Sequence, residues 1–324
     1  MTRPKWTPNM TIQAVQHVRR MRGGAQSHLM RCADGNYYVV KAQNNPQHPR
    51  VLVNDWLGTR LAEMIGLPVP VPAIVDVHPW LVEHSPELRI EVCGQKTMIT
   101  PGLSFGSRYV ASPLEDQVYD YLPEGMLGRV RNIHSFAGIL ALDKWTCNAD
   151  GRQVAFWRRP RERKFNASFI DQGYFFNAGE WSFPDAPLRG VFGRNDVYAG
   201  ITGWNSFEPW LSRIESFPES SLWPLIEQIP PEWYGSAVDE LNRLLGQLLE
   251  RRSLVRDLVL SFKNSSRNPF PNWRDGTVHG AGTDGVRVSV CMGLIGTKSD
   301  CHKAESLAKC APEGSASAGR LARS

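Results

Sequence analysis

The chain has 324 residues, of which 42% are hydrophobic and 21% charged, and its formal net charge is +5. This composition is typical of a soluble globular protein with a sizeable core in one large or two smaller domains. Because no apolar run approaches the ~18 residues that span a bilayer and the N-terminal segment lacks a signal-peptide core, we expect a cytoplasmic protein with no membrane span.

Residues 10–100 predict a short antiparallel sheet with one helix. "TIQAVQHVRR", "HLMRC" and "YYVVKAQ" have strand patterns, and "GGAQS" and Asp34-Gly35 are typical of turns. From Val51 to Ile65 the apolar residues recur every three or four positions, which indicates a helix that ends before Gly66. "VPVPAIVDV" and "QKTMIT" restore the strand pattern, and "PGLSFGSRYVAS" interrupts it.

Residues 101–265 predict a mostly helical region with one β-hairpin. A helix begins near Ser135, "NADG" forms a turn, and the strands "QVAFW" and "NASFI" flank a basic turn, 158–164. Residues 266–324 are rich in glycine, serine and alanine, and we expect a disordered or weakly ordered tail. The fold class is therefore α+β, with a β-rich lobe over residues 1–100 and a helical lobe over 101–265.

The stretch "DKWTCNADGRQVAFW" contains two aspartates that could face a substrate. Asp143 stands five residues before Asn148, the D-x-x-x-x-N spacing of a phosphotransferase loop, but we expect Asp143 late in the helix. Asp150 lies in the loop between the helix and the hairpin, and Asp171 follows the returning strand. Because both strands of a hairpin end on the same side, Asp150 and Asp171 should converge, and we predict Asp150 as the reactive carboxylate.

These segments together resemble the HipA-like kinases, relatives of protein and phosphatidylinositol kinases. "NADGRQVAFW" is similar to the family's catalytic loop D-G-H-x-x-N, and "GGAQS" to its phosphate turn. "YYVVK", "NDWLGTRLAEMIGLPVP", "PGLSFGS" and "FIDQGYFF" resemble further family segments, in the same order. The resemblance implies a two-lobed protein-kinase-like fold that binds ATP and Mg²⁺ between a β-rich N-lobe and a mostly helical C-lobe.

The resemblance also assigns roles to individual residues. The catalytic residue is Asp150, and the nucleotide-binding residues are Gly23, Gly24, Gln26, Lys41 and Asp55. Glycines in a turn let backbone N–H groups approach phosphates, and a lysine that ends a strand can place its charge on them. Asp55 stands where the family has the glutamate that pairs with this lysine. Glu63 is the other acidic candidate on the same helix.

The metal ligands are only partly assigned. Asp171 should hold Mg²⁺, a hard cation that prefers oxygen. The family's second ligand is an asparagine five residues after the catalytic aspartate, and here that position is Ala155. Gln153 or Asn148 could replace it, or neither, so catalytic competence stays open at this point. Arg152 could contact a phosphate or be an exposed loop residue.

Other functions compete with an active kinase that transfers phosphate to a hydroxyl, with protein serine or threonine as one acceptor class that the resemblance implies. The missing asparagine also permits a nucleotide-binding pseudokinase or regulatory module. "GLSFG", residues 102–106, satisfies the G-x-S-x-G motif of serine hydrolases with Ser104 as the nucleophile, but the helix that must follow is not indicated. The run "RRPRERK" is typical of a solvated turn, so we do not expect a nucleic-acid partner.

Overall fold

The computed structural model describes residues 11–274, apart from residues 114 and 124. The strands are β1 Thr11–Arg20, β2 His28–Cys32, β3 Tyr37–Lys41, β4 Pro72–Val77, β5 Arg89–Val92, β6 Gln95–Met98, β7 Gly102–Arg108, β8 Gln117–Tyr119, β9 Gln153–Arg158 and β10 Asn166–Ile170. The α-helices are α1 Val51–Met64, α2 Pro79–Glu83, α3 Ser135–Trp145, α4 Trp210–Glu215, α5 Trp223–Glu227, α6 Val238–Arg251 and α7 Val255–Lys263.

A small closed barrel forms the N-terminal part of this region, with the strand order β1-β2-β3-β7-β4 and a parallel pairing of β1 with β4. The sequence predicted a break at "PGLSFGSRYVAS", and this was wrong, because β7 pairs with both β3 and β4. Small residues hid the strand pattern. A Cβ atom on Gly106 would lie 2.5 Å from Cγ2 of Val75 inside the barrel, so the crowded interior needs glycine there.

The helix and hairpin predicted around the two aspartates are confirmed. Helix α3 covers Ser135–Trp145, and β9 pairs antiparallel with β10 from Ile170↔Gln153 to Asn166↔Trp157. Strand β8 adds to the other side of β9. The open end of the hairpin therefore carries Asp150 just before β9 and Asp171 just after β10.

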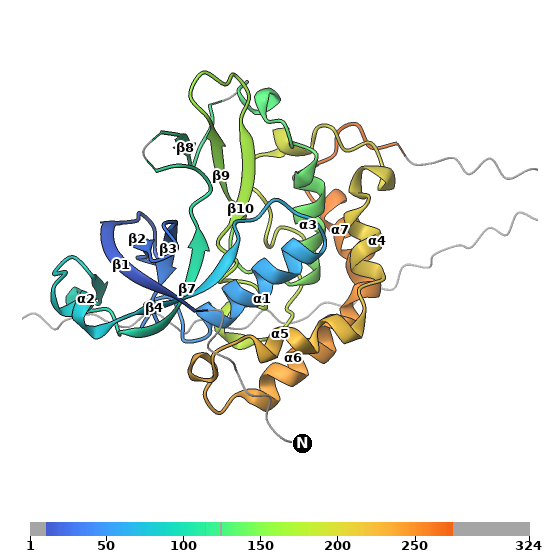
Figure 1. The fold of residues 1–324 in the computed structure, drawn as a ribbon. Helices are drawn as coiled ribbons and strands as arrows, with labels where there is room; N and C mark the ends of the chain where they lie inside the picture. The colour runs from blue at the N-terminus through green and yellow to red at the C-terminus, as the bar shows by residue number, and fades with distance from the viewer. Residues whose placement is uncertain (1–10, 114, 124, 275–324) are drawn as a thin grey trace, which may run out of the picture. The chain divides into compact units, whose positions relative to one another are not determined.

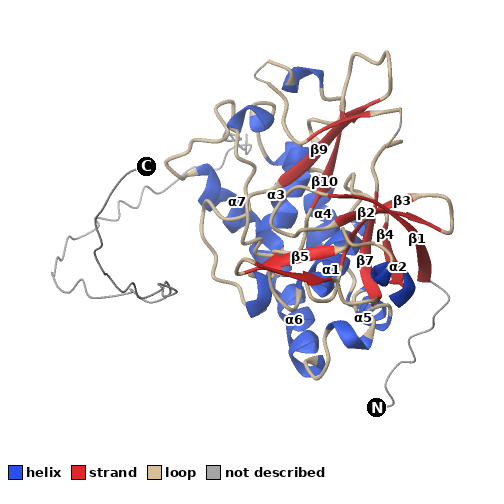
Figure 2. Cartoon of the chain, turned by 90° about the vertical axis from the view of Figure 1, so that its left-hand side faces the viewer, coloured by secondary structure: helices blue, strands red, loops and turns tan. Residues whose placement is uncertain are grey.

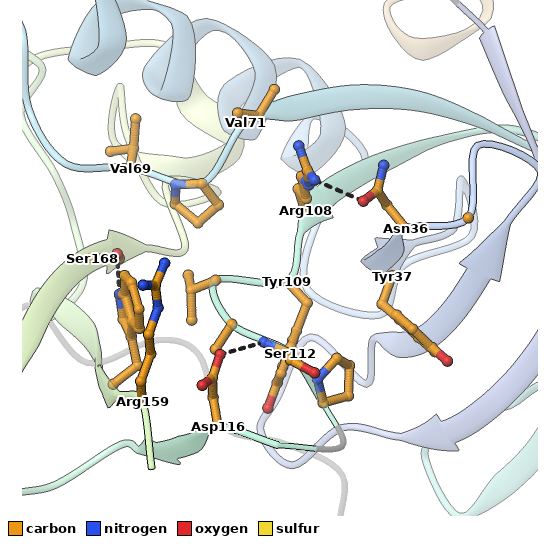
Figure 3. Close-up of a pocket in the computed structure, with 16 residues that line it drawn as sticks. Asn36, Tyr37, Val69, Val71, Arg108, Tyr109, Ser112, Asp116, Arg159 and Ser168 are labelled. Carbon is orange, nitrogen blue, oxygen red and sulfur yellow. Dashed lines mark hydrogen bonds between the residues drawn. The ribbon is translucent and has the colours of Figure 1, made fainter. Parts of the chain in front are cut away.

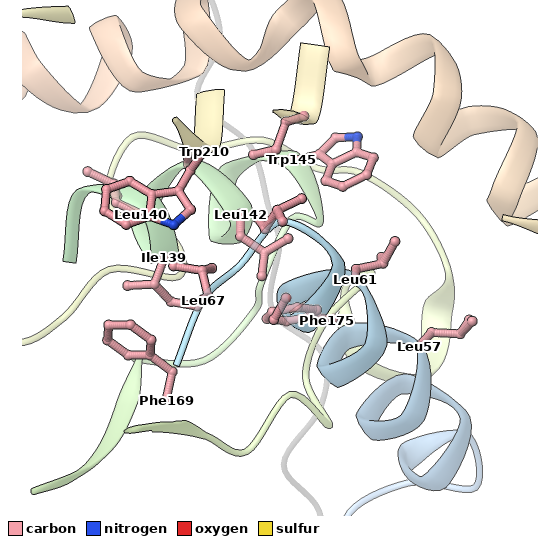
Figure 4. Close-up of a cluster of buried hydrophobic side chains, with 14 of the residues drawn as sticks. Leu57, Leu61, Leu67, Ile139, Leu140, Leu142, Trp145, Phe169, Phe175 and Trp210 are labelled. Atoms are coloured by element: carbon pink, nitrogen blue, oxygen red, sulfur yellow. The ribbon is translucent and has the colours of Figure 1, made fainter. Parts of the chain in front are cut away.

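Two hydrophobic clusters support this arrangement. One fills the barrel, and the other joins α1 to helices α3, α4, α6 and α7. Figures 1 and 2 show the barrel on one side of α1 and these helices on the other. In Figure 4, Leu61 of α1 lies near Phe175, and Trp145 is fully buried in this cluster. Helix α1 therefore connects the barrel to the helical part.

The predicted lobe boundaries at residues 100 and 265 stay predictions. Residues 266–274, which we assigned to the tail, include Phe270, which packs against Phe262 and Tyr198 in the core. The rest of the predicted tail, residues 275–324, lies outside the described residues. Within residues 11–274, no helix is both long and apolar enough to cross a bilayer.

Candidate functional site

Lys41, Asp55 and Asp171 form a buried ion cluster between the barrel and the hairpin. Lys41 ends β3, and its Nζ lies 2.7 Å from Oδ2 of Asp55 on α1 and 2.8 Å from Oδ1 of Asp171 after β10. The side chains of Lys41 and Asp55 are 7% and 1% exposed, while that of Asp171 is 15% exposed. Three residues predicted from separate parts of the sequence therefore meet. Glu63, the other candidate partner, bonds to Arg60 on the surface instead.

Burial and charge oppose each other in this cluster. Burial lowers the pKa of Lys41, but the carboxylates of Asp171 and Asp55 outweigh it and raise the pKa above its ordinary value. Burial raises the pKa of Asp171, but the ammonium of Lys41 outweighs it and holds the pKa below its ordinary value. Burial raises the pKa of Asp55 to about 6, against the pull of Lys41. Lys41 is therefore charged at neutral pH, which suits a residue that binds phosphate.

The segment 171–173 is held in place from several sides. Asp171 has φ of +60°, a left-handed conformation that aspartate tolerates better than most residues. The backbone N–H of Gln172 donates to Oδ1 of Asp55, and Asn54 and His48 both bond to the carbonyl oxygen of Gly173. A strained backbone that its neighbours determine this closely is typical of functional sites.

Gly173 brings this segment close to the ion cluster. A Cβ atom there would lie 2.7 Å from Cγ2 of Val51, 3.1 Å from Oδ2 of Asp55 and 3.4 Å from Nζ of Lys41. Any larger residue at position 173 would displace these groups. The sequence indicated Asp171 and Gly173 but gave no reason to single out Asn54 or His48, because a polar residue before or within a helix is ordinary.

The predicted phosphate turn connects β1 and β2. Gly23 has φ of +111° and Gln26 has φ of +45°, and the N–H of Met21 donates to the carbonyl oxygen of Ser27 to close the turn. The amide of Gln26 exchanges two hydrogen bonds with the backbone of Glu91. Its side chain therefore anchors the turn to β5, while Gly23 and Gly24 are exposed. The turn lies on the barrel, and among the described residues the hydrogen-bond partners of Lys41 are Asp55 and Asp171, not residues of the turn.

Asp150 lies in the exposed loop between α3 and β9. Its backbone N–H donates to Oδ1 of Asn148, and its own Oδ1 accepts from the N–H of Gly151 at 2.7 Å. Gln153, at the start of β9, donates to its Oδ2 at 3.5 Å. An exposed carboxylate with a fixed backbone is accessible to a substrate, and the role of Asp150 as the reactive carboxylate stays a prediction.

Asp143 has the opposite environment. Its Oδ2 accepts from Nε of Arg152 at 3.0 Å, and its Oδ1 accepts from Nη2 of Arg152 at 2.5 Å and from Nδ2 of Asn148 at 2.9 Å. The side chains of Asp143 and Arg152 are 1% and 0% exposed. Asp143 lies late in α3, as predicted, but its burial against Arg152 was not predicted. The alternative that Arg152 is an exposed loop residue was wrong.

This buried ion pair joins the two halves of the hairpin end. Nη1 of Arg152 donates to the carbonyl oxygen of Ile170 at 2.9 Å, and Nη2 is bound to Asp143 on α3. The loop that carries Asp150 and the strand that carries Asp171 are thereby fixed to one guanidinium. The D-x-x-x-x-N spacing therefore corresponds to a buried hydrogen bond between Asn148 and Asp143.

The candidate metal ligands differ in their fit to Mg²⁺. Lys41 binds Oδ1 of Asp171, and the backbone N–H of Gly173 also donates to this carboxylate. A Mg²⁺ ion with bound phosphates needs only one or two protein carboxylates, so Asp171 alone is a sufficient protein ligand. Gln153 is exposed at the open end of the hairpin. Asn148 is buried, and its amide already serves Asp143 and Asp150. Within residues 11–274, no cluster of three or more histidine, cysteine or acidic residues is arranged to hold a metal ion.

A pocket of about 580 Å³ lies at the other end of β3 and β7 (Figure 3). Tyr109, Val69 and Trp157 line it, together with Arg108 and Arg159, and it does not include Lys41, Asp150 or Asp171. Tyr37, at its edge, is four residues before Lys41, which is about 13 Å along an extended strand. The pocket and the ion cluster therefore lie at opposite ends of β3.

The structure excludes the hydrolase hypothesis for Ser104. This residue lies within β7, is fully buried, and its Oγ bonds to the carbonyl oxygen of Gly102. A nucleophile elbow needs a sharp turn from a strand into a helix, and β7 instead continues to Arg108.

Comparison with known proteins agrees with this geometry. Residues 14–156 match the HipA-like kinase family, so the resemblance is confirmed over that segment. The fold is similar to the Helicobacter pylori proinflammatory kinase CtkA, with a TM-score of 0.51 and 11% identity over 79% of this chain and 99% of that chain. No curated protein sequence matches this chain.

Two other solved kinases align less closely. A Golgi casein kinase has a TM-score of 0.46 and 13% identity over 80% of this chain and 76% of that chain. HipA of Shewanella oneidensis MR-1, solved with HipB and operator DNA, has a TM-score of 0.41 and 11% identity over 76% of this chain and 68% of that chain. The family match ends at residue 156, so the placement of Asp171 depends on the structure alone.

Proposed function

Because residues 14–156 match the HipA-like kinases and the fold is kinase-like, we propose that the chain is an ATP-dependent phosphotransferase that moves the γ-phosphate to a hydroxyl. The observation that carries this proposal is the position of Lys41 between Asp55 and Asp171. Phosphoryl transfer needs a cation on the phosphates, a carboxylate for the metal and a group that aligns the nucleophile. The cluster supplies the first two, and Asp150 the third.

Each residue then has a defined task. Asp55 holds the ammonium of Lys41 against the phosphates, and Gly23 and Gly24 let backbone N–H groups of the turn approach them. Asp150 accepts the proton of the acceptor hydroxyl and orients it for attack. The pocket at the far end of β3 is our candidate site for the adenine of ATP, because a nucleotide whose phosphates reach Lys41 can extend along the strand to Tyr37.

Asp171 would hold Mg²⁺, which neutralises charge on the phosphates when bound. We propose that Lys41 then exchanges its contact with Oδ1 of Asp171 for a phosphate oxygen, since both compete for the same ammonium. Gln153 is the better candidate for a second ligand, because Asn148 is buried and already hydrogen-bonded. Protein serine or threonine is the acceptor class that the family implies.

One observation favours a second function, a nucleotide-binding pseudokinase. Ala155 occupies the position of the family's metal-binding asparagine, and it is buried in β9 with 6% exposure, so no ligand can come from that position. Such a protein would bind ATP but transfer no phosphate.

Radiolabelled ATP, Mg²⁺ and a cell lysate distinguish these functions. The wild type should label an acceptor, and Asp150→Asn should lower transfer by about 100-fold or more while ATP affinity changes little, because a general base acts on the transition state. Asp257→Asn, an exposed aspartate on α7, is the matched control. ATP binding without transfer in the wild type would indicate the pseudokinase, and absence of ATP binding would contradict both functions.

A further inference from the structure

The tip of the β9–β10 hairpin concentrates positive charge. Arg159, which lines the pocket, is exposed there. The other exposed cations at or beside the tip are Arg129, Arg131, Arg161, Arg163 and Lys164, which we call the basic tip. Figure 1 shows that this hairpin end lies away from the barrel strands β1–β4. The sequence alone suggested a solvated turn, but it did not indicate that a second segment adds to the charge.

The backbone brings the two segments together. Val130 pairs with Phe165 in an isolated β-bridge. The N–H of Phe165 donates to the carbonyl oxygen of Arg129, and the N–H of Arg131 donates to the carbonyl oxygen of Phe165. Phe165 is 2% exposed and fixes this pairing in the core. The arginines at 129 and 131 therefore stand beside the hairpin tip in a defined arrangement.

The charge of the basic tip is not balanced within the described residues. Glu162 lies 3.6 Å from Arg131, and no carboxylate among the described residues, which do not include Glu124, pairs with Arg161, Arg163 or Lys164. Arg256 pairs with Glu215, but single exposed arginines without a carboxylate partner also occur elsewhere in the described part of the chain, so the basic tip differs from them by its clustering of cations. Clustered like charges repel each other and destabilise the fold slightly, so an anionic partner would gain from binding here.

We propose that the basic tip binds an acidic segment of the protein acceptor. This inference rests on the proposed kinase function and adds its substrate class. Nucleic acid fits less well, because single strands bind through exposed aromatic rings as well as cations, and residues 158–164 contain no aromatic residue. The nearby Trp157 is half-buried, and its Nε1 donates to Ser168.

The hairpin also sets the distance between the acidic segment and the phosphorylated hydroxyl. Asp150 and Gln153 lie at one end of β9 and Arg158 at the other, five residues and about 17 Å along the strand. An extended peptide covers that distance in about five residues. The acceptor should therefore carry its acidic residues at least about five positions from the hydroxyl.

Binding of fluorescent polyglutamate, measured by anisotropy at low salt without ATP, tests the proposal. The variant Arg161→Glu/Arg163→Glu/Lys164→Glu lowers the net charge by six, from +5 to −1. The control Arg19→Glu/Arg31→Glu/Arg243→Glu makes the same change at exposed sites elsewhere. We expect the tip variant to bind about tenfold more weakly than the wild type and the control to bind within about twofold of it. Thermal unfolding of both variants checks that they fold.

Three results would overturn the proposal. The wild type could fail to bind polyglutamate, or both variants could weaken binding equally, which would mean that only net charge matters. An oligo-dT of matched charge could bind more tightly than polyglutamate and lose binding in the tip variant, which would assign the surface to nucleic acid. Because the assay contains no ATP, loss of peptide binding is read separately from loss of phosphoryl transfer, which Asp150→Asn reports.

Discussion

Replacement of Asp143 by asparagine should destabilise the protein far more than its position late in a helix suggests. The carboxylate accepts two hydrogen bonds from Arg152 and one from Asn148, and neither member of the ion pair is more than 1% exposed. An asparagine would leave the guanidinium buried without a counter-charge. Breaking a buried ion pair in this way costs about 3–5 kcal/mol of the free energy of unfolding.

Urea unfolding followed by tryptophan fluorescence measures this change, since Trp145 is buried beside Asp143 in α3. The control Asp257→Asn should change the free energy of unfolding by less than about 0.5 kcal/mol. The double variant Asp143→Asn/Arg152→Gln should recover part of the loss, because no buried charge is left unpaired. Our placement of the loop would be refuted if Asp143→Asn changed the free energy of unfolding by less than about 1 kcal/mol and abolished phosphoryl transfer, while Asp150→Asn transferred phosphate normally. Asp143 would then be the reactive carboxylate.

Further predictions concern the ion cluster and the barrel. Lys41→Ala should weaken ATP binding by about tenfold or more, since a charge-assisted contact contributes about 1.5–3 kcal/mol, and an unchanged thermal shift with ATP and Mg²⁺ would contradict this. Asp171→Asn should abolish the Mg²⁺ dependence of that shift. Gly173→Ala should cost about 1–3 kcal/mol in urea unfolding by overpacking. Burial and the nearby charges of His17 and Arg20 lower the pKa of His28 to about 4. Because the unfolded chain then binds a proton that the folded protein does not, the free energy of unfolding should fall by about 2 kcal/mol as the pH falls from 6.5 toward 4. His28→Gln should remove this contribution to the pH dependence.

The elements with a strong sequence period were predictable. Helices α1 and α3 and the β9–β10 hairpin follow apolar periodicity and turn residues that local chemistry determines. Strand β7 was missed because glycine and serine have low strand propensity, and only its central place in a closed barrel explains them. Tertiary contacts of this kind are not visible in a local pattern.

The candidate site was predictable to the same limited degree. Lys41, Asp55 and Asp171 were each singled out by a motif, and the structure brings both aspartates within hydrogen-bond distance of Lys41. The role of Arg152 was not predictable. The local sequence suggests an exposed turn, whereas Arg152 is buried through its bonds to Asp143, nine residues earlier, and to the carbonyl oxygen of Ile170, eighteen residues later.

The opposite environments of Asp143 and Asp150 are consistent with different roles. A carboxylate that takes a proton from a substrate must be reached by that substrate, and Asp150 is exposed while its backbone is fixed through Asn148. A carboxylate that is enclosed by a guanidinium and an amide cannot be reached without breaking those contacts, and that is the state of Asp143. Because Asn148 bonds to both residues, the buried aspartate holds the loop that carries Asp150, the residue that we propose as the reactive carboxylate.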